Sequence, residues 1–333
     1  MERPIKKVLC LGELLVRLQS SQGSFFSNST GSLKMYAGGS EANVAVTLAN
    51  LGIETAYFTS IPNNALTQEI IQILDSNHID TSKILYQGDR IGSYYLLSAN
   101  GLTSGQVIYD RNYSSFSKLN IQDINWDDLF NDIDLLHITA ITPAINQNLA
   151  DFTLAVLEKA AERNIYISID LNYRNKLWQY GKEPDDIMPA IVNYVDIVMG
   201  NIWASNKMLG TKIDSSLNRE TSKQDYVQYA EQVAHELFEK FPKLKHVANT
   251  YRFMDNANHN LFYGTYHNRT TTTYSETRET NQVVDRIGSG DAFMGGLLYA
   301  LIKNMTPQQI IDTASAAGFE KLFVEGDFGN GKI

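Results

Sequence analysis

The sequence is poor in cysteine, proline and basic charge, and each shortage excludes a class of protein. The 333 residues include a single cysteine, so one chain can form neither a disulfide framework nor a cysteine-based zinc site. Seven prolines and 43% hydrophobic residues exclude a disordered chain and a collagen-like fibre. Because Cys10 falls in the apolar run 8–11, we expect it to be a buried strand residue and not a nucleophile.

Basic charge is also in short supply. Acidic residues number 37 and basic ones 28, which leaves a formal net charge of -9. An acidic surface repels phosphate backbones and anionic lipids, and no run of Lys or Arg offers a local basic patch. We therefore expect neither a nucleic-acid partner nor a membrane partner. The first apolar run has four residues, too few for a signal peptide or a membrane span, which predicts a cytoplasmic protein.

Strand and helix patterns alternate along most of the chain. Short apolar runs predict buried strands at residues 8–11, 55–59, 135–138, 166–169, 195–199 and 246–249. Apolar residues at helical spacing predict helices over 40–51, 66–74, 148–161, 187–193, 226–241, 292–302 and 307–323. This alternation predicts an α/β fold with a mostly parallel sheet covered on both faces. Two further strands, 94–99 and 106–111, flank the turn at Asn100-Gly101 and suggest a small additional sheet.

A glycine-rich turn stands directly before one of the C-terminal helices. Gly288, Ser289 and Gly290 let the backbone turn tightly and present N–H groups at a helix N-terminus, an arrangement that binds anions such as a transferring phosphoryl group. Asp291, at the start of the same helix, is placed to take a proton from an attacking hydroxyl. Taken alone, these four residues are also explained by a tight turn and a helix cap.

With a second glycine motif near the N-terminus, the sequence resembles the pfkB, or ribokinase-like, family of carbohydrate kinases. The two signature regions read GGSEANVA over residues 38–45 and DRIGSGDAF over residues 285–293. Further motifs between residues 12 and 328 look like those of 2-keto-3-deoxygluconate kinases. They are Gly12-Glu13 with Arg17, Pro62-Asn63-Asn64, Arg90-Ile91-Gly92, Tyr109-Asp110-Arg111, Ile141-Thr142-Pro143, Asp170-Leu171-Asn172-Tyr173-Arg174 with Leu177-Trp178, and Gly326-Asp327-Phe328.

The resemblance implies a ribokinase-like three-layer sandwich with a mostly parallel central sheet and a small β-sheet lid. The chain would form one domain over residues 1–333, with the lid built from about residues 14–37 and 90–115. It would phosphorylate the primary hydroxyl of a sugar acid, using ATP and Mg²⁺. Because family members commonly dimerise through the lid, we also expect a homodimer.

The resemblance further assigns roles to residues that match the family's motifs. Asp291 would be the general base, and the amides of Gly288, Ser289, Gly290 and Asp291 would stabilise the transferring phosphoryl group. The sugar would be contacted by Gly38, Gly39 and Asn43, with Tyr94 and Tyr109 lining the pocket and Arg111 and Arg174 binding the carboxylate. The nucleotide would be faced by Asn201, Thr250, Arg252 and Gly290.

The arginines carry the argument for an acidic substrate. A guanidinium fork binds a carboxylate bidentately, which would explain Arg111 and Arg174; an exposed or ion-paired role is the alternative for each. Arg17 stands where relatives acting on neutral sugars often place an Asp, and this also favours an acidic substrate.

Two alternatives to the sugar-acid kinase remain open. One is a kinase of a neutral sugar such as fructose or ribose, and the other is a catalytically impaired sugar-binding or regulatory homologue. The second is motivated by Ala204, because the family usually has a magnesium-organising Glu three residues after the Asn at position 201. The sequence therefore leaves the metal ligands unknown. As an alternative to a nucleotide contact, Asn201 could simply cap the end of a strand.

Overall fold

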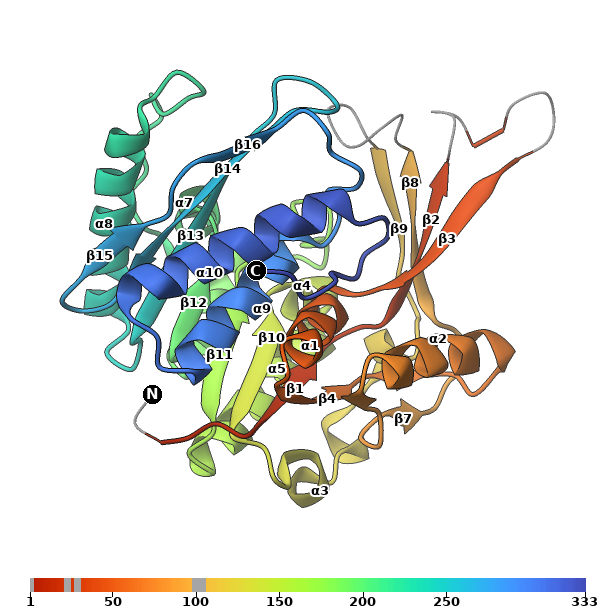
Figure 1. Cartoon of the computed structure of the whole chain (residues 1–333). Helices are drawn as coiled ribbons and strands as arrows, with labels where there is room; N and C mark the ends of the chain where they lie inside the picture. Colours follow the sequence, from red (N-terminus) through yellow and green to blue (C-terminus); the bar gives the residue numbers. More distant parts are fainter. Residues whose placement is uncertain (1–2, 21–24, 27–30, 98–105) are drawn as a thin grey trace.

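The structure is a computed structural model that describes residues 3–20, 25–26, 31–97 and 106–333. At its centre is a ten-stranded sheet in the order β15-β14-β13-β12-β11-β10-β1-β4-β6, with β16 paired to β14 (Figure 1). Its strands are β1 (Lys7–Leu11), β4 (Glu54–Phe58), β6 (Ile79–Asp80), β10 (Leu135–Thr139), β11 (Tyr166–Asp170), β12 (Ile197–Met199), β13 (His246–Phe253), β14 (Asn260–His267), β15 (Thr272–Tyr274) and β16 (Arg278–Thr280). All pairings from β6 to β13 are parallel, whereas β14, β15 and β16 pair in antiparallel fashion.

Helices cover both faces of this sheet and make the fold a three-layer sandwich (Figure 1). One face packs against α1 (Ser40–Asn50), α2 (Ala65–Ser76), α9 (Ser289–Ile302) and α10 (Pro307–Glu320). The other packs against α3 (Trp126–Phe130), α4 (Ile141–Ile145), α5 (Gln147–Glu162), α6 (Pro184–Val192), α7 (Ile202–Leu209) and α8 (Lys223–Lys240). Short 3₁₀ turns lie at Phe116–Lys118, Ile121–Asp123 and Lys321–Phe323.

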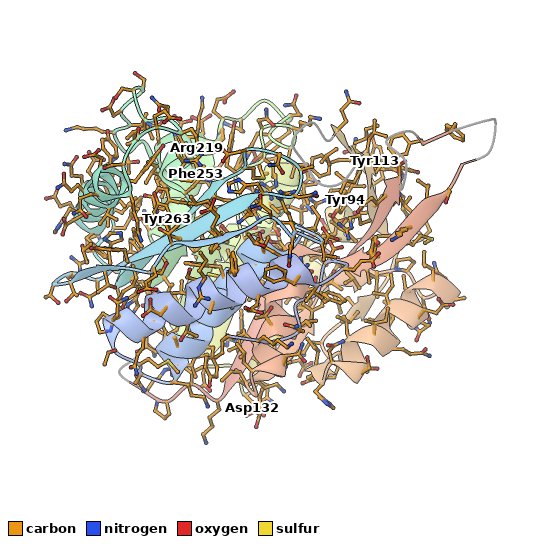
Figure 2. The ribbon with its side chains drawn as sticks, turned by 45° about the horizontal axis from the view of Figure 1, so that its top comes forward. Tyr94, Tyr113, Asp132, Arg219, Phe253 and Tyr263 are labelled. Atoms are coloured by element: carbon orange, nitrogen blue, oxygen red, sulfur yellow. The ribbon has the colours of Figure 1, made fainter. Side chains whose placement is uncertain are left out.

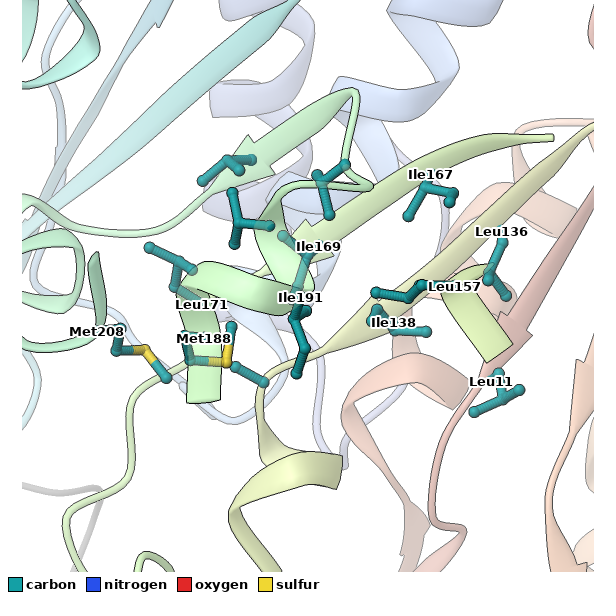
Figure 3. Close-up of a cluster of buried hydrophobic side chains, with 14 of the residues drawn as sticks. Leu11, Leu136, Ile138, Leu157, Ile167, Ile169, Leu171, Met188, Ile191 and Met208 are labelled. Carbon is teal, nitrogen blue, oxygen red and sulfur yellow. The ribbon is translucent and has the colours of Figure 1, made fainter. Parts of the chain in front are cut away.

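Alternation along the central strands explains why there are two separate hydrophobic cores. In β1, Leu9 and Leu11 face the α5 side, while Val8 and Cys10 face the α1 side. Successive side chains of a strand point to opposite faces, so a strand covered on both sides reads as an uninterrupted apolar run. Figure 3 shows the α5-side core, where side chains of the strands meet those of α5, α6 and α7. The prediction that Cys10 is buried in a strand is confirmed, since the residue is fully buried.

A separate four-stranded sheet, in the order β3-β2-β8-β9, stands beside the α1 end of the sandwich (Figure 1). Its strands are β2 (Leu15–Ser20), β3 (Leu33–Gly38), β8 (Gly92–Leu97) and β9 (Gln106–Asp110), and we call it the small sheet. The turn expected at Asn100-Gly101 lies outside the described residues. The role of the small sheet as a lid stays a prediction. A further parallel pair, β5 (Ser60–Ile61) and β7 (Leu85–Tyr86), forms a two-stranded sheet of its own.

The structure differs from the sequence expectations mainly at element ends. The helix expected from residue 292 begins at Ser289, which places Ser289, Gly290 and Asp291 inside its first turn. Helix α7 was not expected from the sequence. Within the described residues, no helix has the combination of length and apolar character that a membrane span requires.

Candidate active site

A cavity of about 650 Å³ opens between the small sheet and the carboxyl ends of the parallel strands. The small sheet contributes Tyr94 and Tyr109, the loop after β11 contributes Asp170 and Arg174, and the start of α9 contributes the glycine-rich turn. Ligands of open parallel sheets bind at this edge, because loops with polar side chains converge there. Figure 2 shows Tyr94 at the small sheet, well apart from the cluster of Arg219, Phe253 and Tyr263 at the antiparallel end of the large sheet.

The backbone at the start of α9 lines this cavity; the amide of Ser289 donates to the backbone oxygen of Arg286 at 3.3 Å, and the amides of Gly290 and Asp291 precede the first helical bond, from Ala292 to Gly288. Gly288 is the N-cap in the left-handed conformation, with a φ of 81°, and a Cβ at this position would overlap the backbone oxygen of Asp327. Only glycine fits both demands. Ser289, Gly290 and Asp291 follow in the first turn, where N–H groups lack helical partners. A Cβ on Gly290 would meet nothing within 4 Å, so the space before the turn is open to an anion.

Asp291 is held by residues from the N-terminal glycine motif. Its Oδ1 lies 2.5 Å from the hydroxyl of Ser40, which donates to it, and its Oδ2 accepts a 2.6 Å bond from Nδ2 of Asn43. Burial raises the pKa of Asp291, while the bonds from Ser40 and Asn43 oppose that shift. A raised pKa with fixed geometry suits a carboxylate that removes a proton near neutral pH.

Ser40 plays a part that the sequence did not predict. A serine at the start of a helix is often its N-cap, but here Gly39 is the N-cap of α1, with a φ of 142°. The Ser40 hydroxyl is instead occupied by Asp291 and by Nδ2 of Asn172, which donates to it at 2.9 Å. Because its hydrogen-bonding capacity is used in the site, it is not available to the helix N-terminus.

Two more buried carboxyls surround this centre. Asp170 lines the cavity and its Oδ1 accepts a 2.9 Å bond from the amide of Asn172, while Glu41 accepts from the amide and hydroxyl of Thr139. Burial raises the pKa of each to about 7. The sequence indicated a polar cluster after β11, but among those residues only Arg174 was assigned a role. Glu41 carried no comparable signal, because an acidic residue in a first helical turn is ordinary.

The arginines differ in how free they are. Arg174 is exposed, lines the cavity and, among the described residues, forms no ion pair. Arg111 also lines the cavity, but its Nε donates a 2.6 Å bond to Oε2 of Glu13, and both side chains are buried. Glu13 also accepts from the hydroxyl of Ser114 at 2.6 Å. The ion-paired alternative thus describes part of the Arg111 guanidinium, whereas Arg174 is unpaired.

Arg17 does not face the substrate cavity. It is fully buried and its guanidinium forms ion pairs with Asp285 at 2.7 Å and with Asp327 at 3.0 Å. The expectation that Arg17 marks an acidic substrate is therefore not supported by its surroundings. Its charge is balanced by acids of the chain, one of which, Asp327, lines the cavity.

The four residues assigned to the nucleotide also border the cavity. Asn201 caps α7, its Oδ1 accepting a 2.8 Å bond from the amide of Ala204, so the cap that was left open as an alternative is present. Thr250 and Arg252 lie on β13, and Nη1 of Arg252 donates to the hydroxyl of Ser289 at 3.3 Å. Gly290 faces the same space from α9. Beside them stands Trp203, 41% exposed and not assigned to the site from sequence.

The residues present do not fit a magnesium site held by the protein. Among the described residues, no group of three or more His, Cys, Asp or Glu side chains is arranged to bind a metal ion. Ala204, at the position of the usual Glu, is buried in the first turn of α7. Of the three acids that line the cavity, Asp291 is held by Ser40 and Asn43, Asp327 is paired with Arg17, and burial raises the pKa of Asp170 to about 7, which disfavours the charged form that a hard cation needs.

The chain is similar to known sugar kinases over most of its length. A solved 2-dehydro-3-deoxygluconokinase from Thermotoga maritima is 30% identical, with a TM-score of 0.86 over 97% of this chain and 95% of that one. A 2-dehydro-3-deoxygalactonokinase of Haloferax volcanii is 25% identical, covering 96% of this chain and 92% of the relative. A fructokinase from Xylella fastidiosa, solved with bound ATP, shares the fold at 20% identity, with a TM-score of 0.74 over 97% of this chain and 94% of that one.

The family comparison covers almost the entire chain. The model described as pfkB family carbohydrate kinase matches residues 5–327 and so includes both glycine motifs and Asp291. The expected ribokinase-like α/β fold is confirmed by the same solved structures. The chain belongs to the pfkB family of carbohydrate kinases and is a sugar phosphotransferase.

Proposed function

We propose that this protein transfers the γ-phosphoryl group of ATP to the primary hydroxyl of 2-keto-3-deoxygluconate. The observation that carries the proposal is the meeting of Asp291, the open turn at Gly290 and the unpaired Arg174 around one cavity. A base, an anion cradle and a free cation are the three elements that phosphorylation of a sugar acid needs.

The chemistry follows from the position of Asp291. Its carboxylate takes the proton of the primary hydroxyl as that oxygen forms a bond to the γ-phosphorus and the bond to the β-phosphate oxygen breaks. The products are the sugar phosphate and ADP. Bonds from Ser40 and Asn43 fix the direction of the carboxylate, and the N–H groups of the first turn of α9 stabilise charge on the phosphoryl oxygens.

Arg174 would bind the carboxylate of the substrate, with Arg111 as a second contact. Arg174 has its guanidinium available, and Arg111 keeps the part of its fork that Glu13 does not use. A neutral sugar would leave Arg174 without a partner in the cavity, which disfavours fructose and ribose. An impaired homologue is disfavoured by the two donors that hold Asp291 in the cavity wall.

The nucleotide would lie towards Asn201, Thr250 and Arg252. Arg252 already contacts Ser289, so it stands where phosphate charge would collect. Because the part of the chain that the structure describes holds no group of three or more His, Cys, Asp or Glu side chains placed to bind a metal ion, we propose that Mg²⁺ enters with the nucleotide as the counter-ion of its phosphates.

The proposal is tested by ADP release with ATP and Mg²⁺ over a panel of acceptors. The panel contains 2-keto-3-deoxygluconate, its galactonate epimer, gluconate, fructose and ribose. We expect the highest kcat/KM with 2-keto-3-deoxygluconate. Rapid turnover of fructose together with none of either keto-deoxy acid would refute the proposal, and no turnover of any sugar would favour the impaired homologue.

We also propose that two copies of the chain pair through the small sheet. Arg17 and Tyr94 face the main body, so their neighbours Leu18 and Tyr95 point to the opposite face. Strand register aligns Met35, Leu18, Tyr95 and Ile108 in one row across that face, and Met35 and Ile108 are 57% and 50% exposed. An apolar row on a sheet with open edges favours a second copy as its partner.

A further inference from the structure

Arg17 joins three parts of the chain that are far apart in sequence. It lies in the middle of β2, and its guanidinium stacks on the ring of Tyr36 in the neighbouring strand at 4.1 Å. Nη1 and Nη2 reach the two carboxylate oxygens of Asp285 at 3.4 and 2.7 Å, and Nε forms the ion pair with Asp327. The small sheet is thereby tied to the turn before α9 and to the C-terminal segment.

Asp285 also accepts hydrogen bonds from the backbone next to the glycine-rich turn. Its Oδ1 accepts a 3.0 Å bond from the amide of Ile287, and its Oδ2 accepts a 3.2 Å bond from the amide of Gly326. The first bond shapes the backbone immediately before Gly288, whose left-handed conformation aims the N–H groups of α9. A change in the position of Asp285 therefore displaces the anion cradle.

Asp327 packs closely against a glycine of each of the two glycine motifs. A Cβ on Gly38 would lie 2.5 Å from its Oδ2, and a Cβ on Gly288 would overlap its backbone oxygen. Its Oδ2 also accepts a 3.3 Å bond from the hydroxyl of Tyr94 in β8. Asp327 thus lies wedged between the sugar side and the phosphate side of the cavity.

The charged side chains of this cluster are buried, so each charge needs a partner in a defined position. Arg17, Lys321 and Asp327 are nearly or fully buried, and Nζ of Lys321 donates to the backbone oxygen of Val324 at 2.9 Å. Buried carboxylates next to each other repel unless a cation stands between them. Burial raises the pKa of Asp327 to about 6, and the charge of Arg17 opposes this rise. Arg17 forms an ion pair with each of Asp285 and Asp327, and the charge of Lys321 also opposes the rise in the pKa of Asp327.

We propose that Arg17 is a positioning residue for phosphoryl transfer, which holds the small sheet and the anion-binding turn of α9 at a fixed distance through Asp285 and Asp327. The sugar is gripped from the small sheet and the phosphoryl group from α9, so this distance sets how closely hydroxyl and phosphorus approach. The inference rests on the proposed roles of the Gly288–Asp291 turn, and it does not depend on which sugar is the acceptor.

The test compares Arg17→Met with Lys34→Met. Lys34 forms a 2.6 Å ion pair with Glu325, which also ties the small sheet to the C-terminal segment, but both side chains are more than half exposed. With whichever sugar the native protein phosphorylates, we expect Arg17→Met to lower kcat by about 10²-fold, the cost of a misplacement near 1 Å. ATP affinity, measured by calorimetry, should change much less than kcat, because the proposed nucleotide contacts of Asn201 and Thr250 do not involve Arg17. Lys34→Met should leave both unchanged.

Hydrogen exchange gives a readout that needs no turnover. Amides of residues 285–291 should exchange faster in Arg17→Met than in Lys34→Met when each variant is held equally far below its own melting temperature. If Arg17→Met does not fold, the triple variant Arg17→Met, Asp285→Asn, Asp327→Asn removes both ion pairs of Arg17 together and is judged by the same criteria. A kcat within twofold of Lys34→Met and equal exchange over 285–291 would overturn the proposal. Faster exchange without turnover of any sugar would instead retain Arg17 as the support of the turn and refute the proposed activity.

Discussion

The hydroxyl of Ser40 lies 2.5 Å from the carboxylate of Asp291, although 251 residues separate them in the chain. Each belongs to one of the two glycine motifs, and each stands in the first turn of its helix, α1 or α9. The motifs therefore form one site: the N-terminal motif orients the base that the C-terminal motif supplies. Two helix N-termini directed at one cavity also favour an anionic ligand there.

Replacing the base is the most direct prediction. Asp291→Asn should lower kcat by about 10²–10⁴-fold, because the amide cannot take the hydroxyl proton but keeps the shape of the carboxyl. ATP binding, measured by calorimetry, should persist. Asp185→Asn, an exposed acid in the first turn of α6, is the matched control. Full activity in Asp291→Asn would exclude this residue as the base.

Removing the unpaired cavity arginine should separate acidic from neutral acceptors. Arg174→Ala loses a charge-assisted contact, so KM for the sugar acid should rise about 10–100-fold while kcat changes little. Neutral sugars, measured in the same ADP-release assay, should show almost no change. Equal effects on acidic and neutral acceptors would remove the carboxylate-binding role.

Arg111 should respond differently, because part of its guanidinium is already paired. Arg111→Ala leaves Glu13 buried without its cation and should destabilise the fold by about 3–5 kcal/mol, visible in chemical denaturation. The double variant Glu13→Gln, Arg111→Met should recover most of that loss. An Arg111→Ala protein as stable as the native one, with only a raised KM, would show that substrate contact is its main role.

The pH dependence of stability should reveal the buried acid Glu41. Its pKa is about 7 when folded and near the ordinary 4.5 when unfolded, so the folded state binds more protons between these values. The free energy of unfolding should therefore fall as pH rises from about 4.5 to 7, by at most about 3 kcal/mol from this group. Glu41→Gln should flatten part of the slope, whereas the exposed Glu69→Gln should not. Parallel slopes for all three proteins would contradict the raised pKa.

Pairing through the small sheet predicts a dimer that charge can break. Light scattering after size exclusion should give twice the mass of one chain for the native protein. Met35→Glu and Ile108→Glu place charges in the exposed apolar row and should yield monomers. Leu66→Glu, on the partly exposed side of α2, is a control that should stay dimeric. A native monomer would refute the pairing.

Much of the central fold could be predicted because its signals are local. Runs such as 8–11 and 166–169 became β1 and β11, since strands covered on both faces need continuous apolar side chains. The turn at Gly288 could likewise be expected, as its conformation demands glycine. Strand β3 gave no such signal, because half of its residues are exposed and its register depends on β2.

The sequence by itself determined the strand and helix order, the glycine turn before α9 and the resemblance to carbohydrate kinases. Only the tertiary structure decided which charged residues remain available for a ligand. Arg17, Arg111 and Arg174 are the same residue type, yet Arg17 is held by Asp285 and Asp327, Arg111 is paired with Glu13, and Arg174 has no ion pair with any residue that the structure describes. The physical reason is that a charge cannot be buried without a partner, and that partner can lie hundreds of residues away.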